Sequence, residues 1–191
     1  SQPGQDVRLK HLRVSCSNKA VPDPILMKKL LFLFLAAALV CAGVHANYSQ
    51  TKTIVLVRHA EKVDASADPE LSAEGKERAQ RLAKKIGKYR PNEIYSTDFK
   101  RTRGTVQPIP TKRHAQIQTY DPRQPQALAD KIMKSEHKRI LVSGHSNTVP
   151  GLANLLGKKE LFKNLEDSEY GAIWVIRIKK GQVQKLEILN Y

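Results

Sequence analysis

The sequence has 191 residues, and its 33 lysines and arginines against 18 aspartates and glutamates give a formal net charge of +15. Its 40% hydrophobic residues, ten glycines and ten prolines fit an ordinary globular domain and exclude acidic disordered, collagen-like and low-complexity chains. Two cysteines are too few for a disulfide scaffold. The basic charge leaves nucleic acid, an anionic membrane surface or a phosphorylated substrate as candidate partners.

Residues 27–46 resemble a secretory signal peptide. Two lysines follow Met27, residues 30–44 carry no charge, and Val44-His45-Ala46 provides a small-x-small cleavage site. Fifteen apolar residues are fewer than the roughly 20 that a membrane-spanning helix needs. We therefore expect residues 1–26 to lie upstream of the native start and residues 27–46 to be cleaved. Residues 47–191 would then be an exported, periplasmic domain without a stable membrane span.

Residues 1–46 carry six of the basic and two of the acidic residues, so the expected mature domain keeps a charge of +11. They also contain both cysteines, Cys16 and Cys41. The mature domain must therefore be stabilised by its core alone.

The first part of this domain predicts a strand and then a helix. Residues 53–57 form a short, apolar, β-branched run, which is typical of a strand buried on both faces of a parallel sheet. Ser72 can cap a helix that runs to about Lys88 and carries an apolar stripe of Ala79, Leu82, Ala83 and Ile86.

The rest of the chain continues this alternation of strands and helices. Asp98 can cap a helix of about ten residues that Pro108 closes. The other predicted elements are strands at 93–96, 117–120 and 139–143, helices at 124–133 and about 149–156, and a hairpin of 172–178 with 183–189. Together they predict an α/β fold, a three-layer α/β/α sandwich with a mostly parallel central sheet and a C-terminal antiparallel hairpin.

Four basic side chains should converge at one edge of this sheet. His59 and His145 each follow a buried strand, and ligands bind at the carboxyl ends of strands in open α/β sheets. Arg58 lies beside His59, and Arg101 follows a third strand. Guanidinium groups pair with phosphate oxygens, and a neutral imidazole is an adequate nucleophile toward phosphorus. These four residues therefore predict a site for a phosphoryl group.

Four ordered motifs resemble the histidine phosphatase superfamily, also called phosphoglycerate mutase-like. Residues 57–62 (VRHAEK) resemble its Arg-His-Gly or Arg-His-Ala signature, and residues 71–79 resemble its LSxxGxxRA helix. Residues 95–105 resemble its second-arginine segment, and residues 142–146 resemble its second-histidine turn. The resemblance covers residue 53 to about residue 156.

The resemblance implies a role for each matched residue. His59 would be the nucleophile that accepts the phosphoryl group, Arg58 and Arg101 would bind phosphate, and His145 would be the second histidine of the site. Ser146 is a candidate substrate-binding residue that could instead cap the next helix. The resemblance implies neither a metal nor an organic cofactor.

The family's general acid, which protonates the leaving group, has no clear match in this sequence. Glu61 adjoins the site in sequence, and Asp121 follows the third strand at the same sheet edge. We favour Asp121 of the two. A leaving group of low pKa, such as a phosphohistidine or an anhydride, would need no strong acid.

The expected function is a cofactor-independent phosphatase acting on a phosphomonoester or a phosphorylated envelope component. Within the family, a lipopolysaccharide core heptose phosphate phosphatase, a phosphohistidine phosphatase and an inactive phosphate-binding member stay open. Nucleic-acid binding is disfavoured because the basic residues are scattered and the aromatic residues are not interleaved with them. A metal site at Glu61 and His145 lacks a recognisable ligand spacing. Nothing in the sequence sets the oligomeric state.

Overall fold

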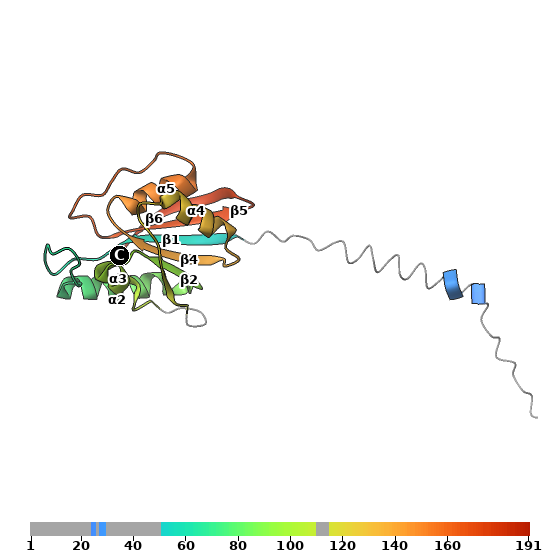
Figure 1. The fold of residues 1–191 in the computed structure, drawn as a ribbon, viewed down its shortest axis with the longest axis horizontal. Helices are drawn as coiled ribbons and strands as arrows, with labels where there is room; N and C mark the ends of the chain where they lie inside the picture. The colour runs from blue at the N-terminus through green and yellow to red at the C-terminus, as the bar shows by residue number, and fades with distance from the viewer. Residues whose placement is uncertain (1–23, 26, 30–50, 110–114) are drawn as a thin grey trace, which may run out of the picture. The chain divides into compact units, whose positions relative to one another are not determined.

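Six strands form one mixed sheet in the order β3-β2-β4-β1-β5-β6 in the computed structural model (Figure 1). The strands are β1 (Lys52–Arg58), β2 (Glu93–Ser96), β3 (Ile117–Thr119), β4 (Arg139–Gly144), β5 (Ala172–Lys179) and β6 (Gln182–Asn190). The first four run parallel to one another, whereas β5 pairs antiparallel with both β1 and β6. The predicted mostly parallel sheet with a closing hairpin is confirmed.

The structure describes residues 24–25, 27–29, 51–109 and 115–191. The apolar core of the predicted signal peptide and its cleavage site lie outside these residues. In the part of the chain that is described, no helix has both the length and the apolar character needed to cross a membrane.

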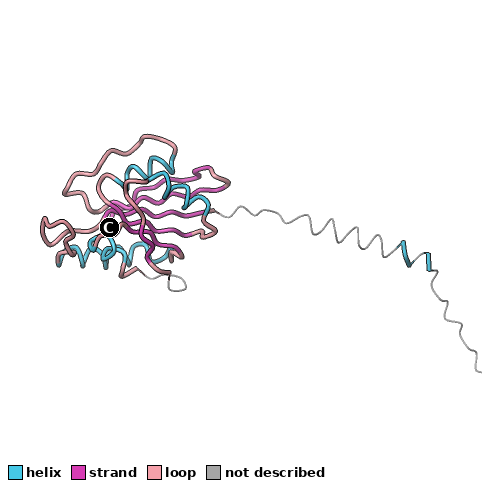
Figure 2. Tube along the Cα trace, viewed as in Figure 1, coloured by secondary structure: helices cyan, strands magenta, loops and turns pink. Residues whose placement is uncertain are grey.

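Helices cover both faces of the sheet, as the tube in Figure 2 also shows. They are α2 (Ala73–Ile86), the 3₁₀ turn η1 (Gly87–Tyr89), α3 (Lys100–Val106), α4 (Pro125–Lys134) and α5 (Thr148–Gly157). Ile54 and Leu56 pack with α4 and α5, whereas Val55 and Val57 pack with α2 and α3. Because successive side chains of a strand point to opposite faces, a strand covered on both sides is apolar at every position. The predicted three-layer sandwich is therefore confirmed.

The register of β1 and β4 brings their carboxyl ends level. Arg58 pairs with Gly144, and the His59 backbone N–H donates to the Gly144 carbonyl at 2.9 Å. His59 and His145 therefore follow directly paired residues. The sheet delivers both imidazoles to the same point of its edge.

The two predicted N-caps have different outcomes. Ser72 caps α2 as expected, because its hydroxyl accepts from the Gly75 backbone N–H at 3.0 Å. The prediction for Asp98 is wrong: the cap of α3 is Phe99, whose side chain makes no capping bond, and the first N–H of the helix, that of Lys100, donates to Asp68 Oδ1 at 2.8 Å. Asp98 instead accepts from Arg103 at 2.9 Å, since an exposed arginine one turn along the helix competes for its carboxylate.

The loop after His59 is packed against the start of α2. The Ser72 backbone N–H donates to the Glu61 carbonyl at 3.0 Å. A Cβ placed on Gly75 would overlap the Glu61 carbonyl oxygen, which is backbone and cannot move aside easily. Only glycine at this position lets α2 approach the loop that begins at His59.

Gly75→Ala should therefore lower the free energy of unfolding by about 2 kcal/mol, the usual cost of overpacking a close contact. Gly87→Ala is the matched control, because Gly87 has ordinary helical angles and no atom lies within 4 Å of its added Cβ. The control should be neutral or slightly stabilising. Urea unfolding of the two variants and the parent chain measures the difference, and equal midpoints for the two variants would contradict the packing described here.

Candidate active site

His59 lies buried at the carboxyl end of β1, with 5% of its surface exposed. Its Nδ1 is 2.8 Å from the carbonyl oxygen of Ala60. A carbonyl can only accept a hydrogen bond, so Nδ1 carries the proton and Nε2 keeps its lone pair. The backbone thus selects the tautomer in which Nε2 can act as a nucleophile.

His145 stands beside it, with ring centroids 5.4 Å apart and the ring planes at 68°. The His145 Nε2 is 3.0 Å from the Thr97 hydroxyl, which donates its one proton to Thr102 at 2.9 Å. Thr97 therefore accepts from His145, and Nε2 carries the proton. The Nδ1 of neutral His145 is left free to take up a proton.

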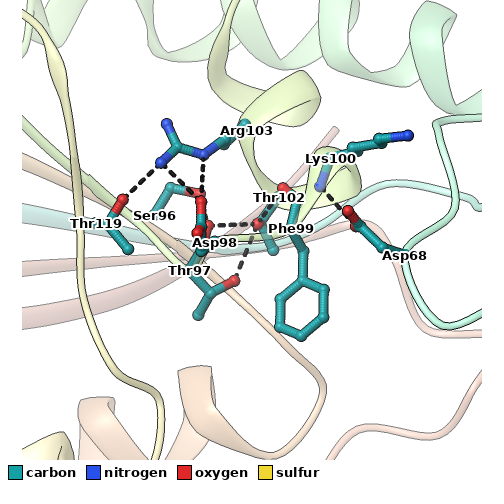
Figure 3. A network of polar contacts seen from close by, with 9 residues as sticks. All are labelled: Asp68, Ser96, Thr97, Asp98, Phe99, Lys100, Thr102, Arg103 and Thr119. Atoms are coloured by element: carbon teal, nitrogen blue, oxygen red, sulfur yellow. Dashed lines mark hydrogen bonds and ion pairs between the residues drawn. The ribbon is translucent and has the colours of Figure 1, made fainter.

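This threonine pair belongs to a wider polar network in the turn between β2 and α3 (Figure 3). Arg103 donates to Asp98 and, from Nη2, to the Thr119 hydroxyl at 2.5 Å. Arg103 and Asp98 thereby form an ion pair. The network fixes the backbone that leads to Arg101.

Both histidines are neutral at pH 7. Burial lowers the pKa of His59 to about 4, and the charges of Arg58 and Arg101 act in the same direction, outweighing the hydrogen bond to Ala60. Burial lowers the pKa of His145 to about 4 as well, again with help from the two arginines. The site therefore holds two uncharged imidazoles beside two guanidinium groups.

Arg58 is almost fully buried, with 3% of its surface exposed. Its Nη1 donates to the carbonyls of Glu166 and Glu169 at 2.7 and 2.9 Å. Its guanidinium carbon lies 4.3 Å from the centroid of the Tyr170 ring. Its Nε–H is buried and has no hydrogen-bond partner among the described residues.

Arg101 has a similar free donor. Its guanidinium carbon lies 4.2 Å from the centroid of the Phe99 ring, and its Nη1 donates to the Ala67 carbonyl at 3.3 Å. The Phe99 ring in turn meets the His145 ring edge-on at 5.2 Å. The Arg101 Nε–H is also buried without a partner in the described part of the chain. Two such donors beside two imidazoles are suited to an anion.

Glu61 lies next to the site but is engaged elsewhere. Its carboxylate accepts from Arg78 Nε at 2.6 Å. Burial by itself would raise the pKa of Glu61, but the hydrogen bonds and charge of Arg78 outweigh it and lower that pKa. Among the described residues, no three His, Cys, Asp or Glu side chains come close enough together to hold a metal ion.

Asp121 follows β3, the edge strand of the sheet, and is likewise paired. It accepts from Arg123 Nη2 at 2.8 Å and from Arg123 Nε at 3.0 Å. These bonds lower the pKa of Asp121 to about 2. Glu61 and Asp121 are therefore both ionised at pH 7, and a proton-donating role for either stays a prediction.

Ser146 contributes its backbone to the structure beside His145. Its carbonyl accepts from the Leu165 N–H at 2.9 Å, which anchors the segment after α5 near the site. Neither Ser146 nor Asn147 caps α5 with its side chain; the Thr148 hydroxyl instead accepts from the His145 N–H at 2.9 Å. A contact of the Ser146 side chain with substrate stays a prediction.

Three residues of the site have no counterpart in the sequence-based predictions: Thr97, Phe99 and Tyr170. Thr97 and Phe99 lie within the second-arginine segment, where their types gave no signal of a contact with His145. Tyr170 reaches Arg58 from more than 100 positions away in sequence, and no spacing rule relates two such residues. The available signal was the acidic run 166–169, whose negative charge favours a position near a buried arginine.

Comparison with solved structures shows a shared fold. The alpha-ribazole phosphatase from Shigella flexneri aligns with a TM-score of 0.62 and 13% identity, covering 73% of this chain and 96% of its own. A mycobacterial glucosyl-3-phosphoglycerate phosphatase aligns with a TM-score of 0.58 and 12% identity, covering 74% and 99%. A protein assigned as phosphohistidine phosphatase SixA of Agrobacterium tumefaciens aligns with a TM-score of 0.57 and 19% identity, covering 73% and 98%.

No curated protein sequence matches the chain significantly. Residues 54–123 match the model of the histidine phosphatase superfamily (branch 1), a span that includes His59 and Arg101 and ends before His145. The matched span contains three of the four motifs that resemble this family, and the solved structures share the fold of the chain.

Proposed function

We propose that this chain is a cofactor-independent phosphatase that hydrolyses a phosphomonoester through a phosphohistidine on His59. The observation that carries the proposal is the pairing of a neutral His59, whose Nε2 keeps its lone pair, with two buried arginine Nε–H donors that have no partner among the described residues. A nucleophile beside donors for the oxygens of its target is the arrangement that phosphoryl transfer requires.

The reaction would take two displacements at phosphorus. The lone pair of His59 Nε2 forms a P–N bond while the P–O bond to the leaving group breaks and its electron pair departs with the oxygen. Water then attacks the same phosphorus, the P–N bond breaks and its electron pair returns to Nε2. The free imidazole is regenerated, and inorganic phosphate, which keeps both protons of the water, is released. Arg58 and Arg101 would stabilise the charged oxygens in both steps.

His145 would join them once the substrate is bound. A phosphoryl dianion beside its ring favours the protonated imidazole, against the burial and the arginine charges that keep it neutral in the free protein. The proton would enter at Nδ1, since Nε2 already donates to Thr97. His145 would then donate to a phosphoryl oxygen.

The full chain should hydrolyse p-nitrophenyl phosphate in the presence of EDTA, and His59→Ala should abolish this activity. The value of kcat/KM should be level near neutral pH and fall as the pH approaches 4, because a protonated His59 has no lone pair to attack with. Exposed His137→Ala is the matched control and should keep the parent profile.

Three results would refute this mechanism: equal activity of parent and His59→Ala, an inert parent between pH 4 and 8, or strong loss of activity in EDTA. The last would instead indicate a metal-dependent reaction. An inert parent that still binds orthovanadate would indicate a phosphate-binding protein without catalysis.

The ionised state of Glu61 and Asp121 favours a substrate whose leaving group needs no proton. Because Glu61 and Asp121 are both ionised and paired with arginines, the described site offers no carboxyl proton for an alkoxide. A phosphohistidine or anhydride substrate would need no such proton. This makes a phosphohistidine phosphatase the second candidate, ahead of an enzyme acting on a heptose phosphate of the lipopolysaccharide core.

Asp121→Asn should therefore leave the rates of hydrolysis of p-nitrophenyl phosphate and phosphoramidate within about twofold of the parent's. If Asp121 were the general acid, its loss would typically cost 10²-fold or more. The parent should also hydrolyse these two compounds faster than glycerol phosphate, whose alkoxide leaves poorly. Initial rates at saturating substrate measure both effects. A selective loss of glycerol phosphate hydrolysis in Asp121→Asn would instead identify Asp121 as the acid.

We propose further that the enzyme is exported to the periplasm, as residues 27–46 predict. Its partner would be a phosphorylated small molecule or envelope component. The charge of +11 on residues 47–191 would attract such anions over a range that salt shortens.

A further inference from the structure

Arg58 is buried, so neighbouring groups must hold its charged guanidinium in place. Transferring a guanidinium from water is costly unless its hydrogen bonds and charge are compensated. Its Nη1 donates to the carbonyls of Glu166 and Glu169, and its face lies on the Tyr170 ring. All three partners come from one segment, residues 166–170, which we name the arginine clamp.

The clamp holds Arg58 without neutralising it. Its two hydrogen-bond acceptors are carbonyls, which carry no net charge. The nearest carboxylate in the clamp is that of Asp167, which lies 3.7 Å from Nη2, beyond hydrogen-bond distance, and is fully exposed to solvent. Water screens a fully exposed carboxylate at this distance, so Asp167 compensates little of the charge of the buried Arg58. Arg58 therefore keeps most of its positive charge for an incoming anion.

The clamp also selects which edge of the guanidinium stays free. Both N–H groups of Nη1 are used by the two carbonyls, so Nε–H and Nη2 remain. These two nitrogens form the side-on fork that pairs with two oxygens of a phosphate. The unpartnered Nε–H belongs to this fork.

Tyr170 is the central side chain of this arrangement. One contact is with Arg58, another is with Arg78, whose guanidinium carbon lies 5.9 Å from the ring centroid, and a third is with His59 at 6.1 Å. Arg78 is itself fixed by Glu61, in the loop that follows His59. Tyr170 therefore links the clamp to the loop of the nucleophile.

We propose that Tyr170 is a positioning residue, which holds the guanidinium of Arg58 so that its Nε–Nη2 fork receives the phosphoryl group beside His59. The expected effect of Tyr170 on catalysis rests on the proposed function, whereas its expected effect on phosphate binding requires no turnover. Removing the ring of Tyr170 should therefore weaken phosphate binding, whereas removing only its hydroxyl should not.

Tyr170→Leu in the full chain should weaken the binding of inorganic phosphate and orthovanadate about tenfold, the size of a desolvated cation–π contact. The KM for p-nitrophenyl phosphate should rise by a similar factor, with a smaller change in kcat. Tyr170→Phe keeps the ring and should stay within about twofold of the parent. Tyr89→Leu is the matched control, because Tyr89 is also half-buried beside a cation, Lys88, but belongs to η1.

Binding is measured as the rise of the unfolding temperature with phosphate concentration, which needs no enzymatic activity. If loss of the Tyr170 ring reduces this rise in unfolding temperature while the parent chain hydrolyses no substrate, the clamp is supported and the proposed function is refuted. An active chain in which Tyr170→Leu binds phosphate like the parent, or in which Tyr170→Phe loses as much as Tyr170→Leu, would refute the clamp.

A double-mutant cycle with Arg58 separates an effect of Tyr170 on Arg58 from a general loss of the site. In an Arg58→Lys background the ammonium has no planar face or fork to be held. Tyr170→Phe and Tyr170→Trp, which both keep a ring, should bind phosphate with the parent's affinity in the Arg58 chain. Tyr170→Leu should cost less than about twofold in the Arg58→Lys chain. A loss of the same size in both backgrounds would mean that Tyr170 acts on something other than Arg58.

Discussion

The parallel pairing of β1 with β4 is the constraint on which the site depends. It places Arg58 opposite Gly144, so that each strand ends at the same level and is followed by a histidine. A Cβ on Gly144 would lie 2.8 Å from the hydroxyls of both Thr148 and Tyr120. The end of β4 therefore has no room for a side chain at this position. A slip of one residue in the pairing would move one of the two imidazoles to another level.

Given this pairing, the electrostatics follow from burial. The enclosed edge of the sheet keeps both imidazoles neutral, while two guanidinium groups are held there by carbonyls and aromatic faces. The cost of burying this positive charge is met when the protein folds. A phosphoryl dianion, the ligand we propose, would find its donors already oriented, which is how preorganised charge lowers a barrier. Carboxylates at hydrogen-bond distance would have weakened the same site by competing for the arginines.

Much of this arrangement could be predicted from sequence. The apolar β-branched runs identified the buried strands, because a strand covered on both faces must be apolar throughout. His59, His145, Arg58 and Arg101 lie together because the carboxyl ends of adjacent parallel strands share an edge. The contacts of Glu61 could not be foreseen. Its carbonyl accepts from the Ser72 N–H and its carboxylate accepts from Arg78, while its suggested role as a proton donor stays a prediction.

The same contacts explain the second motif in physical terms. The loop that follows His59 is met by the N-cap Ser72 through a hydrogen bond, and by Gly75 and Arg78 of α2 through a close approach and an ion pair. Tyr170 could not be predicted because it arrives from a long segment without regular structure, where neither periodicity nor turn chemistry fixes a partner. The capping prediction for Asp98 failed for a local reason. Aspartate is a suitable N-cap residue, but here the Asp98 carboxylate accepts from Arg103 instead.

We propose that His59 carries the phosphoryl group during turnover, and trapping the phosphorylated intermediate tests this proposal. The enzyme would be mixed with substrate for milliseconds, quenched in alkali, in which phosphohistidine is stable, and mapped by mass spectrometry. We expect one alkali-stable, acid-labile phosphate on the peptide that contains His59, attached at Nε2. A phosphate on His145 or on a hydroxyl, or turnover without any phosphorylated enzyme, would contradict it.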